Sequence, residues 1–176
     1  MGVTVVKRID FDKLKMHNEI NIIASIIKKD ITDGVNQGVD INGNPFKPLS
    51  PNTIAAKGHD KPLIDTGLMK KVYIKPRAKK GRPRASIIPP KGKNRTEIGG
   101  YHNEGTKPYK IVPKKKSGML AFKTKDGMVY TKSVNHPGLP KREWFGISKR
   151  AEAKIKKQLA LRLMEKLRQP TKVIKK

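Results

Sequence analysis

The sequence predicts an α+β fold, in which an antiparallel β-sheet or sandwich of short strands is packed by a long N-terminal helix and a C-terminal helix. Near both ends of the chain, apolar residues recur every three or four positions, which is the period of an amphipathic helix. Between these stretches, short β-prone runs alternate with Gly- and Pro-rich turns, as in short antiparallel strands. A length of 176 residues favours one domain, which we expect over residues 1–170, followed by a basic tail at 171–176.

The N-terminal helix is expected after a short β-prone run at residues 3–6 that suits an edge strand. Asp10 or Asp12 is the candidate N-cap, and the helix is expected to end near residues 34–38. Its apolar stripe favours packing against the core, with docking of a partner helix as the alternative. The stripe consists of Leu14, Ile20, Ile23, Ile27, Ile31 and Val35.

Turn signals and a short helix follow. Residues 40–49 are rich in turn formers, and Asn42-Gly43 suits a turn that needs a positive φ. Ser50-Pro51 predicts an N-cap with Pro at the first helical position, which opens a short helix that Gly58 ends. Thr66 is the candidate cap of a further short helix at residues 67–71.

The middle of the chain is expected to form the short strands, at residues 72–74, 85–88, 96–98, 111–112, 119–122 and 128–131. Asp126-Gly127 predicts a hairpin turn between the last two strands. Basic loops are expected at 75–95 and 107–118, and a Pro-rich loop at 136–140.

The C-terminal helix has the clearest pattern. Ser148 is its candidate cap, and Pro170 is expected to prevent its continuation. Its apolar face is expected to contain every fourth residue, namely Ile147, Ala151, Ile155, Leu159, Leu163 and Leu167.

Positive charge is concentrated after residue 66. Residues 1–66 hold nine Lys and Arg against eight Asp and Glu, residues 67–132 hold nineteen against three, and residues 133–176 hold thirteen against three. Such a density of like charge indicates an anionic partner, which could be nucleic acid, a membrane or acidic protein. The candidate partner-facing residues are Lys75, Arg77, Lys79, Lys80, Arg82, Arg84, Lys91, Lys93, Arg95, Lys114, Lys115, Lys116, Lys149, Arg150, Lys154 and Lys157.

No catalytic, metal or cofactor site is expected. The chain has no Cys, which excludes disulfides and thiolate metal sites. Its four His residues lack the spacing of a helical metal site, and its carboxylates are few and scattered. His102 and Glu104 are two residues apart in a Gly-rich segment, where a loop hydrogen bond is a better interpretation than an acid–base pair.

The same composition limits which partners and which cellular locations are expected. No apolar run approaches the roughly 18 residues of a membrane span, and the N-terminus does not resemble a signal peptide, so a cytoplasm-like compartment or a particle assembled there is expected. The C-terminal stripe lacks the Trp or Phe anchors of an interfacial helix, which disfavours a membrane. Non-specific DNA binding of packaging or nucleoid type remains the alternative, because basic loops can track phosphates.

Seven stretches resemble known bacteriophage proteins. In order, residues 44–58 (NPFKPLSPNTIAAKG), 63–69 (LIDTGLM), 101–106 (YHNEGT) and 140–148 (PKREWFGIS) resemble the virion-morphogenesis, or tail-completion, proteins of Mu-like tailed phages. Residues 104–111, 120–122 and 136–138 resemble related tail-completion proteins of lambdoid phages. The motif residues are Pro45, Phe46, Leu49, Asp65, Thr66, Gly67, Leu68, His102, Gly105, Thr106, His136, Pro137, Gly138, Trp144, Phe145 and Gly146.

This resemblance implies a structural protein of the virion neck, assembled in the host bacterial cytoplasm. Such proteins act as a tail terminator or head–tail connector, and they form a ring, commonly hexameric, between the portal proteins and the tail tube. The resemblance implies neither an enzyme activity nor a cofactor, and the partners that it implies are further copies, portal and tail-tube proteins, and DNA in the channel. The motif residues are expected to maintain the fold, with Trp144, Phe145 and Ile147 anchoring the last helix, while the basic loops contact the partner.

Overall fold

The computed structural model describes residues 16–90, 98–115, 118–124 and 126–168. Its architecture confirms the predicted α+β class. Helix α1 (Met16–Gln37) precedes the short strands in the sequence, and helix α4 (Lys149–Arg168) follows them. The elements between them are α2 (Pro51–Lys57), η2 (Leu68–Lys70), β1 (Tyr73–Ile74), β2 (Ile87–Ile88), α3 (Ile98–Glu104), β3 (Tyr109–Ile111), β4 (Leu120–Thr124), β5 (Gly127–Thr131) and β6 (Val134–His136).

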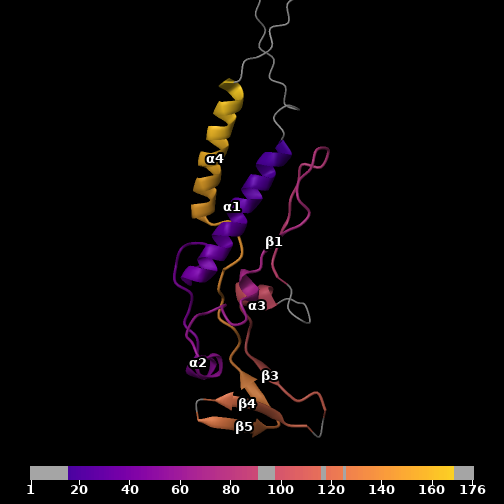
Figure 1. The fold of residues 1–176 in the computed structure, drawn as a ribbon. Helices are drawn as coiled ribbons and strands as arrows, with labels where there is room; N and C mark the ends of the chain where they lie inside the picture. The colour runs from indigo at the N-terminus through magenta and orange to yellow at the C-terminus, as the bar shows by residue number, and fades with distance from the viewer. Residues whose placement is uncertain (1–15, 91–97, 116–117, 125, 169–176) are drawn as a thin grey trace, which may run out of the picture.

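The strands in the described part of the chain pair as three separate two-stranded antiparallel sheets, β1–β2, β3–β6 and β4–β5. Figure 1 shows an elongated molecule. Helices α1 and α4 lie side by side at one end, and α2 and the β3–β6 and β4–β5 pairs lie at the other. The β1–β2 hairpin runs beside α1 (Figure 1), so its loop belongs to the helical end.

The hydrophobic core lies beneath α1. The stripe predicted on this helix is confirmed in its C-terminal half, where Ile27, Ile31 and Val35 are buried, whereas Ile20 and Ile23 are only partly buried. Loops from distant parts of the chain complete the core, because no single sheet here is wide enough to cover the helix. The buried cluster consists of Ile27, Ile31, Val35, Phe46, Leu63, Met69, Val72 and Trp144.

Two buried carboxylates fasten α1 to α4. The Ser148 hydroxyl caps α4 by accepting a hydrogen bond from the amide of the third residue after it, and it donates to Asp30, which is 5% exposed. Near the other end of the interface, Glu19 accepts a hydrogen bond from the ammonium of Lys166 at 2.8 Å, and the Arg162 guanidinium lies 3.6 Å away. Both acids lie on the face of α1 that was predicted to be apolar, and both have polar or cationic partners on α4.

Several local predictions are confirmed. Ser50 caps α2, Pro occupies its first turn, and Gly58 ends the helix with φ 77°. Gly43 has φ 89° in its turn, and Gly127 has φ 125° where the β4–β5 hairpin reverses direction. The strands predicted at 72–74, 85–88, 111–112, 119–122 and 128–131 are all present, with no end shifted by more than two residues.

Other local predictions are wrong. The strand at 96–98 is not formed at Ile98, which instead begins α3, and the helix includes Gly99, Gly100 and the segment expected to be a loop around His102. Packing decides this, because Gly99 lies directly beneath the Trp144 ring. Thr66 does not cap the next turn, since Gly67 occupies the cap position and makes no side-chain cap bond.

Near the C-terminus, the predicted apolar stripe of α4 also needs correction. Ala151 is fully buried, but Leu163 is 50% exposed, and Ile147, predicted to anchor the helix, is 62% exposed. A spacing of four residues advances by about 40° per step around a helix of 3.6 residues per turn, so such a stripe rotates out of a straight interface. The loop expected at 136–140 begins one residue later, because His136 is the last residue of β6.

Some predictions fall outside the described residues. They are the strand at 3–6, the Asp10 or Asp12 cap, Leu14, the basic residues Lys91, Lys93, Arg95 and Lys116, the Leu167 side chain, Pro170 and the tail at 171–176.

Candidate docking surfaces

A basic arm, which we define as residues 75–86, connects β1 to β2 and projects beside α1 (Figure 1). The arm narrows to a tight turn in which Lys79 and Arg82 pair through their backbones and Gly81 has φ 78°. Its cationic side chains are all exposed, and none forms an ion pair with a carboxylate of the described residues. These residues are Lys75, Arg77, Lys79, Lys80, Arg82 and Arg84.

Asn21 on α1 holds the arm in place. Its amide donates to the backbone carbonyl of Ala78 at 2.9 Å, and its side-chain oxygen accepts from the Ala78 amide, also at 2.9 Å. The side chain thus makes the two bonds that a neighbouring strand would make, and Ala78 is 4% exposed. The sequence analysis missed this contact, for which the only signal is a polar residue within an apolar stretch of α1.

A cleft of about 560 Å³ opens where the base of the arm meets α1. Aliphatic and aromatic side chains line part of it, and cations from two elements line the rest. Its lining residues are Lys28, Tyr73, Ile74, Lys75, Arg77, Ile88 and Pro89. Two predicted partner-facing residues, Lys75 and Arg77, therefore share a concave surface with Lys28, which the sequence analysis did not single out.

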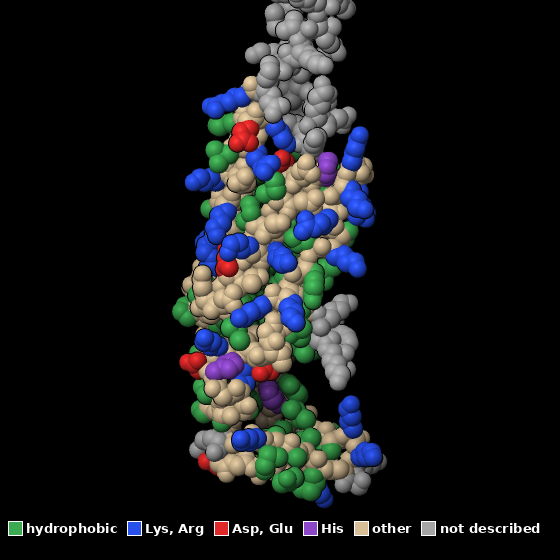
Figure 2. All heavy atoms as spheres, viewed as in Figure 1, with side chains coloured by type: hydrophobic (Ala, Val, Ile, Leu, Met, Phe, Trp, Pro, Cys, Tyr) green, Lys and Arg blue, Asp and Glu red, His purple; other side chains and the backbone are tan. Residues whose placement is uncertain are grey.

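The remaining basic residues lie on other surfaces. Lys149, Lys154 and Lys157 are exposed on α4, as are Lys114 and Lys115 in the loop after β3. Arg150 differs, because its guanidinium lies 3.3 Å from Asp30 on α1 and belongs to the α1–α4 interface. Figure 2 shows Lys and Arg side chains spread over the helical end of the molecule.

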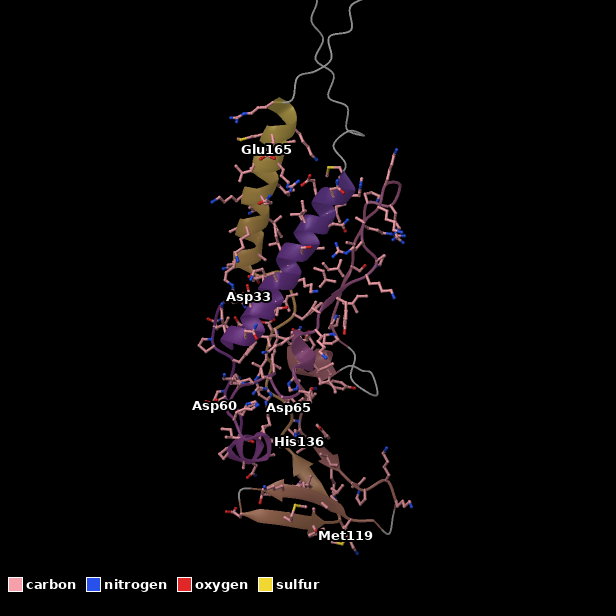
Figure 3. The ribbon with its side chains drawn as sticks, in the orientation of Figure 1. Asp33, Asp60, Asp65, Met119, His136 and Glu165 are labelled. Atoms are coloured by element: carbon pink, nitrogen blue, oxygen red, sulfur yellow. The ribbon has the colours of Figure 1, made fainter. Side chains whose placement is uncertain are left out.

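The β4–β5 hairpin presents an apolar face at the opposite end, where Figure 2 shows hydrophobic side chains gathered. Met128 and Tyr130 share one face of the hairpin and are 55% and 64% exposed. Phe122 and Val129 share the other face, are less exposed at 36% and 37%, and belong to the sheet that approaches α2. Met119, labelled at this end in Figure 3, adds a further side chain that is 57% exposed. Within the described part of the chain, the face that Ala121 and Lys123 share with Met128 and Tyr130 is therefore exposed.

The motif segments converge around residues 138–148. The Arg142 guanidinium, 4% exposed, donates to the carbonyls of Lys47 and Pro48, and its own backbone amide donates to the His102 carbonyl. The Trp144 indole, 2% exposed, donates to the Gly99 carbonyl at 2.9 Å. These contacts join the motifs at 44–58, 101–106 and 140–148 through backbone groups, so this junction maintains the fold.

Close backbone packing explains two motif glycines. Gly105 has φ 76°, and a Cβ there would lie 2.8 Å from the Leu139 carbonyl oxygen. Gly138 has φ 86°, and a Cβ there would overlap the Thr106 carbonyl oxygen. The Thr106 side chain accepts from the Leu139 amide in the same crossing.

Other motif residues vary in exposure. Phe46 and Trp144 are in the core, and Leu49, Gly67, Leu68, Phe145 and Gly146 are partly buried. His136, labelled in Figure 3, stacks on Tyr109 with ring centroids 4.9 Å apart. The surface-exposed motif residues are Pro45, Asp65, Thr66 and Pro137.

His102 is the most unusual titratable group at this junction. Burial lowers its pKa, and the positive charges of Arg142 and Lys57 lower the pKa further. Its Nδ1 is buried and has no hydrogen-bond partner among the described residues. The neighbouring Glu104 accepts a hydrogen bond from the Asn103 side chain at 2.9 Å.

Comparison with known proteins finds no match. No protein-family model, curated protein or solved structure matches this chain. Within residues 16–90, 98–115, 118–124 and 126–168, no three His, Asp or Glu residues are grouped so as to hold a metal ion. None of the helices in those ranges has the length and apolar character that crossing a membrane requires.

Proposed function

We propose that this protein is a structural component of the neck of a tailed bacteriophage, which assembles into a ring and joins the DNA-filled head to the tail as a tail-completion protein or head–tail connector. The order of seven motifs that resemble such proteins supports this proposal. On this proposal the protein is not an enzyme, and its partners are further copies, the portal proteins and the tail tube.

The observation that carries the proposal is the largely apolar face of β4–β5 with Met128 and Tyr130, which the described residues leave exposed. A two-stranded hairpin is marginally stable in water unless a further surface covers it. Met128 and Tyr130 gain from burial against protein, whereas a phosphate backbone offers them little. A ring is built from head-to-tail contacts between unlike surfaces, so a hairpin at one end of each copy suits that geometry.

Native mass spectrometry of the full chain tests the assembly step. We expect a discrete closed oligomer, commonly of six copies in the family that the chain resembles. Tyr130→Ser is expected to raise the protein concentration needed for assembly by at least about tenfold, because Tyr residues at interface centres contribute about 2 kcal/mol or more to binding. Tyr101→Ser, at a residue 53% exposed on α3, is the matched control and is expected to leave the assembly unchanged.

A deletion in the producing phage tests the function itself. We expect filled heads and complete tails to accumulate separately in electron micrographs. Normally joined virions in the deletion strain would refute the neck proposal.

Non-specific DNA binding of packaging or nucleoid type is the second candidate, favoured by the exposed cations of the arm, which pair with no carboxylate of the described residues. It predicts that DNA affinity falls steeply with salt, since each neutralised phosphate adds about 0.9 to the logarithmic slope. It also predicts chains that coat DNA without forming a closed oligomer.

A further inference from the structure

The cleft between α1 and the base of the arm combines two kinds of surface. Lys28 reaches it from α1, and Lys75 and Arg77 reach it from the arm, and all three side chains are exposed. Among the described residues, no carboxylate lines the cleft, so these cations have no neutralising partner there within that part of the chain. An occupant that carries negative charge is therefore favoured.

The remaining lining residues are apolar or aromatic, which indicates what kind of anion the cleft binds. Ile74, Ile88 and Pro89 are aliphatic, and Tyr73 is 52% exposed. A phosphate backbone would use the cations and leave this apolar surface in contact with water. A volume of about 560 Å³ accommodates an apolar side chain together with its flanking backbone.

We propose that this cleft is a docking site for an acidic protein segment, one apolar side chain of which packs onto the paired Tyr73 and Ile88 while flanking Asp or Glu carboxylates pair with Lys28, Lys75 and Arg77. The inference rests on the proposed function, since it names the chemistry of the neck protein that the arm meets. Recognition combines apolar burial with charge pairing, so both kinds of side chain are required.

Fluorescence anisotropy with a labelled peptide of alternating Asp and Leu tests the site on the full chain. A poly-Asp peptide of equal charge is expected to bind about tenfold more weakly, because it lacks the apolar anchor. Lys75→Glu is expected to weaken Asp-Leu binding by about tenfold or more. Lys80→Glu is the matched control, since it makes the same charge change on the same arm outside the cleft, and is expected to reduce affinity by no more than about threefold.

Tyr73→Ser distinguishes a peptide-binding site from a site for nucleic acid. We expect this substitution to lower the affinity for the Asp-Leu peptide and to leave the affinity for a labelled 20-base-pair DNA duplex unchanged. If Lys75→Glu and Lys80→Glu lowered the affinity equally, for both the Asp-Leu peptide and the DNA duplex, the proposal would be overturned in favour of phosphate tracking along the arm. Equal affinity for poly-Asp and Asp-Leu would overturn it in favour of charge alone.

Two further outcomes are distinguished by the same assay. Tighter peptide binding by an Asp10→Asn/Asp12→Asn variant would show competition from the chain's own N-terminal residues and would overturn a site for a partner. If the chain forms the closed oligomer but does not bind the peptide, the docking proposal is refuted and the neck proposal stands. A chain that binds the peptide but forms no oligomer, with a deletion strain that yields joined virions, refutes the neck proposal.

Discussion

The Ser148 hydroxyl donates a 2.5 Å hydrogen bond to the Asp30 carboxylate, across 118 residues of chain. The same oxygen accepts from the Ala151 amide and so caps α4. One side chain therefore both starts the last helix and fixes it against the first.

Ser148→Ala removes the helix cap and the hydrogen bond to Oδ2 of the buried Asp30 carboxylate, whose Oδ1 keeps its contact with Arg150. We expect the free energy of unfolding to fall by about 2–3 kcal/mol, measured by urea denaturation. Asp33→Ala is the surface control, since Asp33 pairs with the exposed Lys29 in the next turn of α1, and is expected to cost about 0.5 kcal/mol or less. Equal costs for the two variants would show that the buried contact adds nothing.

Asn21→Ala is expected to release the arm while leaving α1 intact, because it removes both hydrogen bonds to Ala78. Loss of two such bonds is expected to raise the hydrogen-exchange rate of the Ala78 amide by roughly tenfold. Mass spectrometry of hydrogen exchange at residues 75–86 measures this rate. Asn36→Ala, at an exposed position on the same helix, provides the control, and unchanged exchange in both variants would show that the arm holds its position without Asn21.

Gly138→Ala is expected to lower the free energy of unfolding by about 2–4 kcal/mol, because the new Cβ meets the Thr106 carbonyl at a positive φ. Gly81→Ala shares the positive φ but has open space around it, so its cost is expected to be about 1 kcal/mol. Denaturation midpoints of the two variants measure the difference. Similar midpoints would mean that the backbone crossing relaxes around a methyl group.

Stability is expected to fall as the pH decreases through 6.5, the ordinary pKa of histidine. Burial lowers the pKa of His102 in the folded state, so below pH 6.5 the unfolded chain binds this proton more readily than the folded chain. The stabilisation is fully present above pH 6.5 and is lost as the pH falls towards the lower folded value. Thermal unfolding of wild type and His102→Gln between pH 8 and 5 measures it, and parallel profiles would exclude His102 as the cause.

Local patterns predicted the parts of this fold that depend on near neighbours. Ser50-Pro51 and Gly58 delimit α2 as expected, because capping is settled within a few residues. The arm was also predictable, since its Gly, Pro and cationic residues disfavour burial. Its exposure follows from composition, but its anchor does not, because the Asn21–Ala78 contact joins residues 57 apart.

Long-range packing decided the rest. Gly99 and Gly100 discourage helix formation locally, yet α3 forms where Gly99 allows close contact with Trp144. The buried Arg142 is found only once its carbonyl partners are in place, since a charged residue is ordinarily placed on the surface.

The sequence by itself determined the α+β class, the two terminal helices and the exposed basic arm, because amphipathic periodicity and charge density are properties of short stretches of chain. Only the tertiary structure decided that Lys28, Tyr73 and Arg77 share a cleft, that Arg150 faces Asp30, and that the strands divide into three pairs. These features depend on which distant surfaces meet, and that is set by the total burial and hydrogen bonding of the folded chain.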